Sequence, residues 1–117
     1  MNPAEIKKTI SYGDFDKVDI RVGTILSVEE VPESRKLMKL RVDLGDHERQ
    51  ILAGIRQERD DPREIEGRQA LFVVNLAERE MAGEVSQGML FDIGYQDGVL
   101  PVLAVPEKPV PNGTRAG

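Results

Sequence analysis

The 117-residue sequence has no cysteine, no tryptophan and a single histidine, His47. The lack of cysteine excludes thiol catalysis, disulfide bonds and cysteine-ligated zinc, and a lone histidine with neither a second histidine nor a cysteine argues against a metal site or a nucleophilic triad. No apolar run approaches the roughly 18 residues of a membrane span, and the N-terminus lacks the pattern of a secretory signal. We therefore expect a cytoplasmic protein with no membrane partner, no metal, no cofactor and no enzymatic activity.

Acidic residues outnumber basic ones by 21 to 16, and the formal net charge is −5 at pH 7. Affinity for nucleic acid comes mainly from neutralised phosphates, so this balance argues against generic nucleic-acid binding. The hydrophobic fraction of 39% and charged fraction of 32% are typical of a folded globular domain. The length predicts a single domain covering 1–117.

Alternation of apolar and polar residues predicts a series of half-buried strands. The first begins at Val18 and continues on one face through Val22, Leu26 and Val28, with Gly23 predicting a bulge or bend. The further expected strands are 38–44, 48–53, 68–76 and 88–95. A short helix is expected at 62–67 and a turn or two of helix at 3–10, ended by 11–14. A hairpin turn is expected at 96–98.

Three strands, a short helix and two more strands is the order of an OB-fold, an all-β, five-stranded Greek-key barrel. Residues 1–14 and 99–117 would then be N- and C-terminal extensions, and another small barrel or sandwich is the alternative. OB-folds bind ligands on the face of strands 2 and 3, between the loops that join strands 1–2 and 4–5. Here these loops are predicted at 31–36 and 77–87.

Basic side chains gather on this expected face, while acidic ones concentrate around 58–66. A negative chain can therefore still present one basic surface. The basic set contains seven of the 16 Lys and Arg residues: Arg21, Lys39 and Arg41 on the first two strands, Arg35 and Lys36 in the first loop, Arg49 on the third strand, and Arg79 in the second loop. The alternative interpretation is an ordinary solvated surface, with Arg21 or Arg41 paired to a neighbouring aspartate.

Aromatic residues are scarce, and none is expected on the outward face of the first three strands. They are Tyr12, Phe15, Phe72, Phe91 and Tyr95. Binders of single-stranded nucleic acid stack bases on such side chains. We therefore expect any RNA to be recognised through its backbone and shape, by phosphate and 2′-hydroxyl contacts.

Several sequence blocks occur in the order found in one known family. They are KVDIRVG at 17–23, Lys36-Leu37, VDLG at 42–45, RQILAGI at 49–55, NLAEREM at 75–81, SQGM at 86–89 and PVPNG at 109–113. Together they resemble the tRNA-binding domain family over about residues 15–113. That family includes the C-terminal domain of many bacterial methionyl-tRNA synthetases, stand-alone dimeric tRNA-binding proteins and the chaperone CsaA. With no catalytic domain, this chain resembles the free-standing members.

The resemblance implies an OB-fold, a homodimer and recognition of tRNA by shape, largely without sequence specificity. It places the binding loop at 75–89, where Asn75, Arg79, Met81, Ser86, Gly88 and Met89 match the family pattern. We predict RNA contacts from Asn75, Arg79, Ser86 and Met89 in addition to the basic set. The alternatives are a backbone cap for Asn75, a turn hydroxyl for Ser86 and packing for Met89.

The chain departs from the family pattern inside this loop. The family usually has proline where Glu78 stands and basic residues where Glu80 and Ala82 stand, and Glu84 adds another acid. Losing two phosphate contacts would shift the slope of affinity against salt by about two units and weaken binding by an order of magnitude or more.

Apolar residues in 99–105 and on both faces of the fourth strand predict a homodimer, to which 1–14 and 99–117 contribute. Two other functions stay open. One is a CsaA-like chaperone that binds unfolded or pre-secretory polypeptides. The other is a targeting subunit that docks to an aminoacyl-tRNA synthetase.

Overall fold

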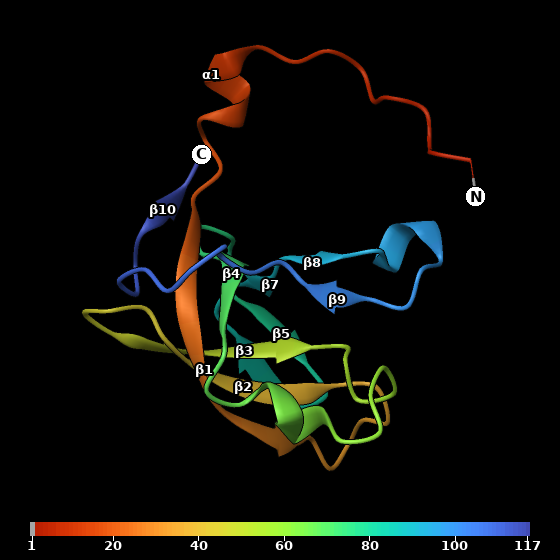
Figure 1. Ribbon diagram of the computed structural model, residues 1–117. Coiled ribbons are helices and arrows are strands. Elements are labelled where there is room, and N and C mark those ends of the chain that lie inside the picture. Colours follow the sequence, from red (N-terminus) through yellow and green to blue (C-terminus); the bar gives the residue numbers. More distant parts are fainter. Residues whose placement is uncertain (1) are drawn as a thin grey trace.

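The structure is a computed structural model that describes residues 2–117, so Met1 of the expected N-terminal extension lies outside the described residues. Its main sheet has the strand order β3-β2-β1-β4-β7, and β10 pairs with the start of β1 (Figure 1). The elements are α1 (Tyr12–Phe15), β1 (Ile20–Glu30), β2 (Met38–Asp43), β3 (Glu48–Ala53), η1 (Pro62–Ile65), β4 (Gln69–Val73), β5 (Arg79–Met81), β6 (Glu84–Ser86), β7 (Met89–Leu90), β8 (Asp92–Ile93), η2 (Tyr95–Asp97), β9 (Val102–Leu103) and β10 (Arg115–Ala116).

The sheet curls because β1 pairs with a different strand along each half of its length. Residues 20–24 pair with β4, and residues 24–30 pair with β2. Near the changeover, a Cβ on Gly23 would lie 2.6 Å from Cγ1 of Val42, so only glycine allows β1 to approach β2 this closely. The curled antiparallel sheet is an OB-like barrel and confirms the predicted all-β fold.

The sequence predicted a bulge or bend at Gly23, and β1 changes its partner from β4 to β2 beside this residue. The register with β2 also shifts between Ile25 and Ser27, and strict alternation fails over this stretch, since Val22, Ile25 and Val28 are all buried. Ile25 is fully buried, whereas Leu26 is 44% exposed. The prediction that Leu26 faces the core is therefore wrong, because simple alternation cannot register an inserted residue.

The alternation does hold in β2, whereas in β3 the consecutive residues Ile51, Leu52 and Ala53 are all buried. Met38, Leu40 and Val42 of β2 are buried, and β3 has the predicted bounds. The predicted short helix is the 3-10 helix η1, which begins with proline. Asp61 caps it by accepting a hydrogen bond from the amide of Arg63 at 3.0 Å. These elements enclose the core of the barrel.

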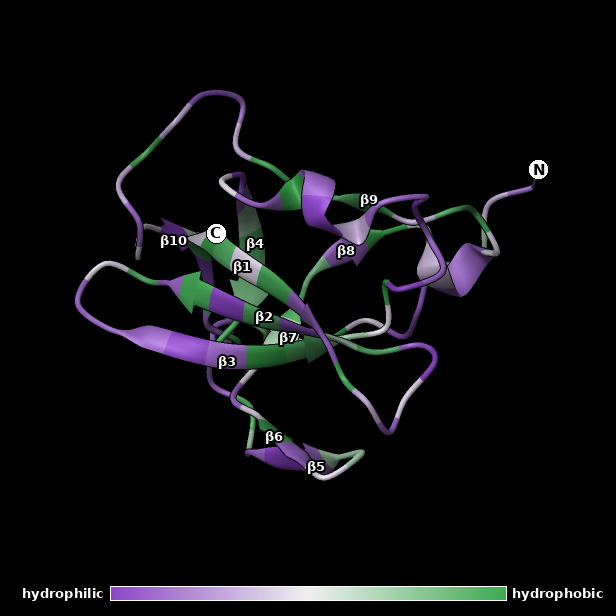
Figure 2. Ribbon diagram, turned by 90° about the horizontal axis from the view of Figure 1, so that it is seen from below, coloured by the Kyte–Doolittle hydropathy of each residue, from purple (hydrophilic) through white to green (hydrophobic). Residues whose placement is uncertain are grey.

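A hairpin occupies the segment 77–87, which we expected to be a polar loop. β5 pairs with β6, and Arg79 lies opposite Ser86. The turn residues Ala82 and Gly83 both have positive φ, 51° and 81°, the conformation of a type I′ turn. Asn-Gly is the usual sequence of that turn, so the Ala-Gly sequence found here did not predict a hairpin. Figure 2 shows this hairpin as a mainly hydrophilic ribbon beside the barrel.

The predicted fifth strand, 88–95, is divided into two short strands with different partners. β7 pairs with β4, whereas β8 pairs with β9. Between them, the amide of Phe91 donates to the carbonyl of Leu71 at 3.0 Å. The turn predicted at 96–98 lies in the connection from β8 to β9, which includes η2. These elements form a small ribbon at one end of the barrel.

The helix predicted within 3–10 is wrong, because residues 2–10 contain neither helix nor strand. Helix starts instead at Tyr12. Ser11, which we expected to break a helix, is its N-cap and accepts a hydrogen bond from the amide of Asp14 at 3.1 Å. Figure 1 shows the N-terminal segment extending away from the barrel.

Candidate nucleic-acid interface

The basic side chains of strands β1 and β2 are held in ion pairs across the sheet surface. Arg21 Nε lies 2.9 Å from Asp19 Oδ1, Arg41 Nε lies 2.9 Å from Glu48 Oε1, and Lys39 Nζ lies 3.5 Å from Glu84 Oε1. The hydrogen bond from Arg21 lowers the pKa of Asp19. The Arg21 pair matches the alternative left open by the sequence, whereas Arg41 pairs with glutamate rather than aspartate. Phosphate would have to displace these acids.

Arg49 is held more firmly than the other basic side chains. Its Nη1 donates to the carbonyl oxygens of Val74 and Gln87, the latter at 3.1 Å, and its Nε donates to His47 Nε2 at 3.0 Å. The guanidinium thus connects β3 to the ends of two other segments. This arrangement uses most of its donors inside the protein and favours a structural role.

Two polar residues of the expected binding loop also bond the protein backbone. The Asn75 side chain accepts from the amide of Asp19 at 2.9 Å and donates to the carbonyl of Lys17 at 2.6 Å. The Ser86 hydroxyl accepts from the amide of Leu52 at 3.0 Å and is only 2% exposed. Both side chains therefore join distant segments of the chain, and Ser86 is turned away from solvent.

Three basic residues of the set are exposed and form no ion pair within residues 2–117: Arg35, Lys36 and Arg79. The backbone of the loop that carries Arg35 and Lys36 is nevertheless held by hydrogen bonds. The carbonyl of Lys36 accepts from the amide of Arg56 at 3.1 Å, and that of Arg35 accepts from Gln57 at 3.3 Å. An anchored loop with unpaired cationic side chains is suited to binding phosphate.

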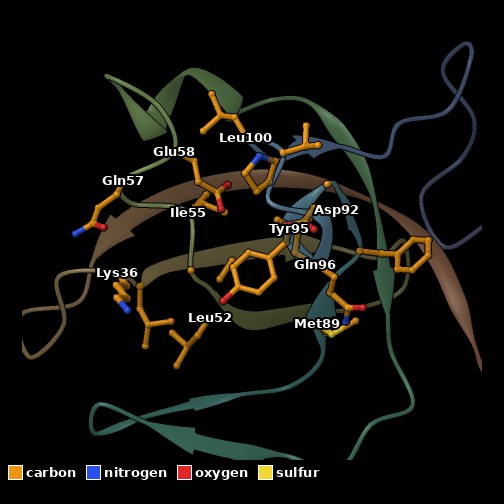
Figure 3. Close-up of a pocket in the computed structure, with 18 of the residues that line it drawn as sticks. Lys36, Leu52, Ile55, Gln57, Glu58, Met89, Asp92, Tyr95, Gln96 and Leu100 are labelled. Carbon is orange, nitrogen blue, oxygen red and sulfur yellow. The ribbon is translucent and has the colours of Figure 1, made fainter. Parts of the chain in front are cut away.

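Lys36 and Arg79, which are distant in the sequence, line one groove of about 1090 Å³. Its walls come from the end of β3, the β5–β6 hairpin and the segment 89–101. Exposed apolar residues of the groove include Met89, Phe91 and Tyr95. Figure 3 shows the Tyr95 ring in the middle of the groove, with Lys36 and Met89 on different sides in this view.

The sequence did not predict the two aromatic residues of this groove, Phe91 and Tyr95. These residues do not lie on the outward face of the first three strands but belong to the segment that carries β8 and η2. Their position depends on how that segment folds beside the end of β3. The cluster of aromatic residues at 91–95 is the signal that could have pointed to them.

The groove also contains carboxyl groups. Burial raises the pKa of Asp92, and burial together with the nearby Asp92 charge raises the pKa of Glu58. Arg59 partly compensates Glu58, since its Nη1 lies 3.5 Å from Oε1 of that carboxyl. The part of the groove beside Glu58 and Asp92 is therefore unfavourable for a bound anion.

The acids of the β5–β6 hairpin differ in their surroundings. Glu84 lies 3.5 Å from Lys39, and Glu78 accepts a hydrogen bond from Gln87 at 3.4 Å. Glu80 is exposed and has no ion-pair partner in the described part of the chain. Among these acids, Glu80 is the least compensated charge near Arg79.

Across residues 2–117, no group of three or more His, Cys, Asp or Glu residues is arranged to hold a metal ion. No helix in the same residues is long and apolar enough to cross a membrane.

Residues 20–115 match a protein family described as "Putative tRNA binding domain". The chain belongs to this family. Two methionine–tRNA ligases are among its relatives: that of Chlorobium chlorochromatii is 47% identical over 96 residues, and that of Parabacteroides distasonis is 43% identical over 109 residues. These alignments cover 82% and 93% of this chain but only 14% and 16% of the ligases.

Two solved structures resemble this chain over their whole length. A MetRS-related protein from Pyrococcus horikoshii has a TM-score of 0.86 and 35% identity, covering 95% of this chain and 100% of that one. The chaperone CsaA from Bacillus anthracis has a TM-score of 0.81 and 30% identity, covering 94% and 100%. The resemblance to the tRNA-binding domain inferred from the sequence blocks is therefore confirmed.

Proposed function

We propose that this chain is a non-catalytic tRNA-binding protein of the cytoplasm that recognises tRNA by shape and phosphate charge as a homodimer. Membership in the tRNA-binding domain family supports tRNA as the ligand class. The observation that carries the proposal is that Lys36 and Arg79 line the same groove. Both are without an ion-pair partner in residues 2–117, so they can neutralise phosphate without displacing an internal acid.

The ion-paired basic residues would contribute less to the affinity for RNA than Lys36 and Arg79. Exposed ion pairs contribute about 0–1 kcal/mol, so a phosphate competes with their acidic partners at modest cost. Arg21, Lys39 and Arg41 can thus contact RNA after exchanging partners. Many such contacts over a curved surface favour a folded RNA of matching shape over one particular base sequence.

The proposed homodimer is supported by an apolar surface on the β8–β9 ribbon. Ile93 lies directly opposite Val102 in the ladder, and these side chains are 55% and 53% exposed. Neither lines the groove, so this surface is separate from Lys36 and Arg79. Two copies joined here by a two-fold axis would bring two basic surfaces onto one particle, and a folded RNA could contact both.

Filter binding of bulk tRNA over a range of salt concentrations tests tRNA binding. The affinity should fall as salt rises, and Lys36→Ala or Arg79→Ala should each lower the salt slope by about one unit. Their free energies of unfolding should change by less than about 0.5 kcal/mol, as expected at exposed positions. Lys108→Ala, in the C-terminal segment, is the matched control. Absence of binding at low salt, or binding insensitive to salt, would contradict the proposal.

A chaperone that holds unfolded polypeptides is the second candidate function. The likeness to CsaA and the apolar lining of the groove support it. Suppression of the aggregation of denatured test proteins would favour this function, and inactivity with several such clients would count against it. Retrieval of bound material from lysate, with and without nuclease, separates RNA, unfolded protein and a synthetase as partners.

A further inference from the structure

We propose that the groove around Tyr95 is a binding site for one unpaired nucleotide of an RNA, with the base against the Tyr95 ring and its phosphate at Lys36 and Arg79. This inference rests on the proposed function and extends it. It adds a site for single-stranded RNA to a surface that otherwise recognises shape. The sequence had led us to expect no stacking residue at the binding face.

Tyr95 is placed to act as a stacking platform. Its ring is 70% exposed, although it lines a groove. The backbone around it is held by hydrogen bonds to the carbonyl of Gly94, from the amides of Asp97 and Val99, each at 3.1 Å. An exposed ring on an anchored turn can stack on a base without losing contacts of its own.

The charges of the groove determine which part of a nucleotide can enter. Cationic side chains lining it are Lys7, Lys36 and Arg79, whereas Glu58, Asp92 and Asp97 supply carboxyl groups. In Figure 3 the Tyr95 ring lies between Lys36 on one side and Asp92 on the other. A phosphate next to Glu58 or Asp92 would be repelled, but a neutral base would not. The favoured orientation therefore has the base at the carboxyl side and the phosphate at the lysine side.

The dimensions and lining of the groove suit a nucleobase. Its volume of about 1090 Å³ lies slightly above the roughly 300–1,000 Å³ of small-molecule sites, so a nucleobase would occupy part of it. Leu52, Ile55 and Met89 provide apolar walls beside the ring. A base inside a duplex is paired and stacked and cannot reach Tyr95 without leaving the helix. The site should therefore select single-stranded segments.

Oligonucleotide binding by fluorescence anisotropy tests the site. The ligands are a labelled single-stranded RNA of about six nucleotides, within the usual site size of an OB-fold, and a blunt RNA duplex. The variants are Tyr95→Ala, Tyr95→Phe and the control Tyr12→Ala, which removes another exposed tyrosine outside the groove. Thermal melts of all variants confirm that each is folded.

Tyr95→Ala should weaken binding of the single strand by roughly 5- to 150-fold, the equivalent of one lost stacking contact. Duplex binding should be unchanged, and Tyr95→Phe and Tyr12→Ala should bind like the parent protein. Equal single-strand binding by Tyr95→Ala and the parent overturns the inference. So does a loss in Tyr95→Phe as large as that in Tyr95→Ala, because stacking needs the ring and not the hydroxyl.

The same experiment separates failure of this site from failure of the proposed function. If the parent protein binds tRNA but its single-strand affinity does not depend on Tyr95, the nucleotide site alone is wrong. If the parent binds neither tRNA nor oligonucleotide, the proposed function is wrong as well. A denatured polypeptide whose binding depends on Tyr95 while RNA binding does not would assign the groove to polypeptide and overturn the inference.

Discussion

Ser86 and Leu52 are joined by a hydrogen bond that connects the β5–β6 hairpin to β3. The Ser86 hydroxyl accepts from the amide of Leu52 at 3.0 Å and donates to the carbonyl of Gly88 at 2.9 Å. Gly88 packs tightly in turn, since a Cβ there would lie 2.8 Å from the carbonyl oxygen of Val73. A residue that the family pattern placed in the binding loop thus bonds inside the protein.

We predict that Ser86→Ala destabilises the protein by about 1–3 kcal/mol, because it leaves a buried amide without an acceptor. Denaturant unfolding measures the change. Val85→Ala, the exposed neighbour on the same strand, is the control and should cost less than about 0.5 kcal/mol. If Ser86→Ala weakened tRNA binding with no loss of stability, the hydroxyl would be an RNA contact instead.

The Glu80 carboxylate lies on the strand that also carries Arg79, and it has no ion-pair partner in residues 2–117. We predict that Glu80→Lys tightens tRNA binding by several-fold to tenfold at low salt, because it removes a repulsion and adds one phosphate contact. The salt slope should become steeper by about one unit. A salt titration of tRNA binding measures both changes.

Glu107→Lys is the matched control for this charge reversal, since it makes the same change in the C-terminal segment. It should have a much smaller effect on tRNA affinity. Equal gains from the two variants would show that net charge, rather than the position of Glu80, governs binding. No gain from Glu80→Lys would place the RNA away from the hairpin.

The sequence predicted elements best where local pattern and tertiary structure agree. β3 was located in full because its apolar residues are buried and a tight turn precedes it. The inward and outward residues of β1 were not all predicted correctly, because the register shift between Ile25 and Ser27 depends on pairing with β2. Ala82 and Gly83 form a turn in which the glycine is of the expected residue type and the alanine is not.

The basic face illustrates the same limit for the candidate site. The sequence located the cationic residues but not their partners, and Lys39 pairs with Glu84, which is distant along the chain. The groove could not be predicted from the sequence either, because Tyr95 and Lys36 line the same groove only when the segment after β7 folds beside the end of β3. Long-range contacts of this kind have no local pattern.

The exposed pair Ile93 and Val102 provides a test of the dimer. We predict that Ile93→Asp converts the protein to a monomer, because it places a charge in the centre of an apolar interface. Sedimentation equilibrium measures the change. Leu26→Asp makes the same substitution at an exposed leucine on β1 and should leave the dimer intact. A monomeric parent protein, or a dimer that survives Ile93→Asp, would contradict the proposed interface.

Asp92 gives a prediction whose sign depends on pH. Burial raises the pKa of its carboxyl in the folded state, so the folded protein holds the proton more tightly than the unfolded chain. The stabilising contribution is present at low pH and is lost as the pH rises through the folded-state pKa. At neutral pH the charge opposes folding, and Asp92→Asn should therefore raise stability by up to about 0.5 kcal/mol, a small value because the group is partly solvated.

This gain should shrink as the pH is lowered, because the parent carboxyl then becomes neutral. Asp19→Asn should behave in the opposite way. The hydrogen bond from Arg21 lowers the pKa of Asp19, so its stabilising contribution exists above the pKa of the unfolded chain and is lost as the pH falls. Urea unfolding of both variants at neutral and acidic pH compares the two signs. A loss of stability in Asp92→Asn at neutral pH would show that the Asp92 charge is compensated by Arg59 in the folded protein.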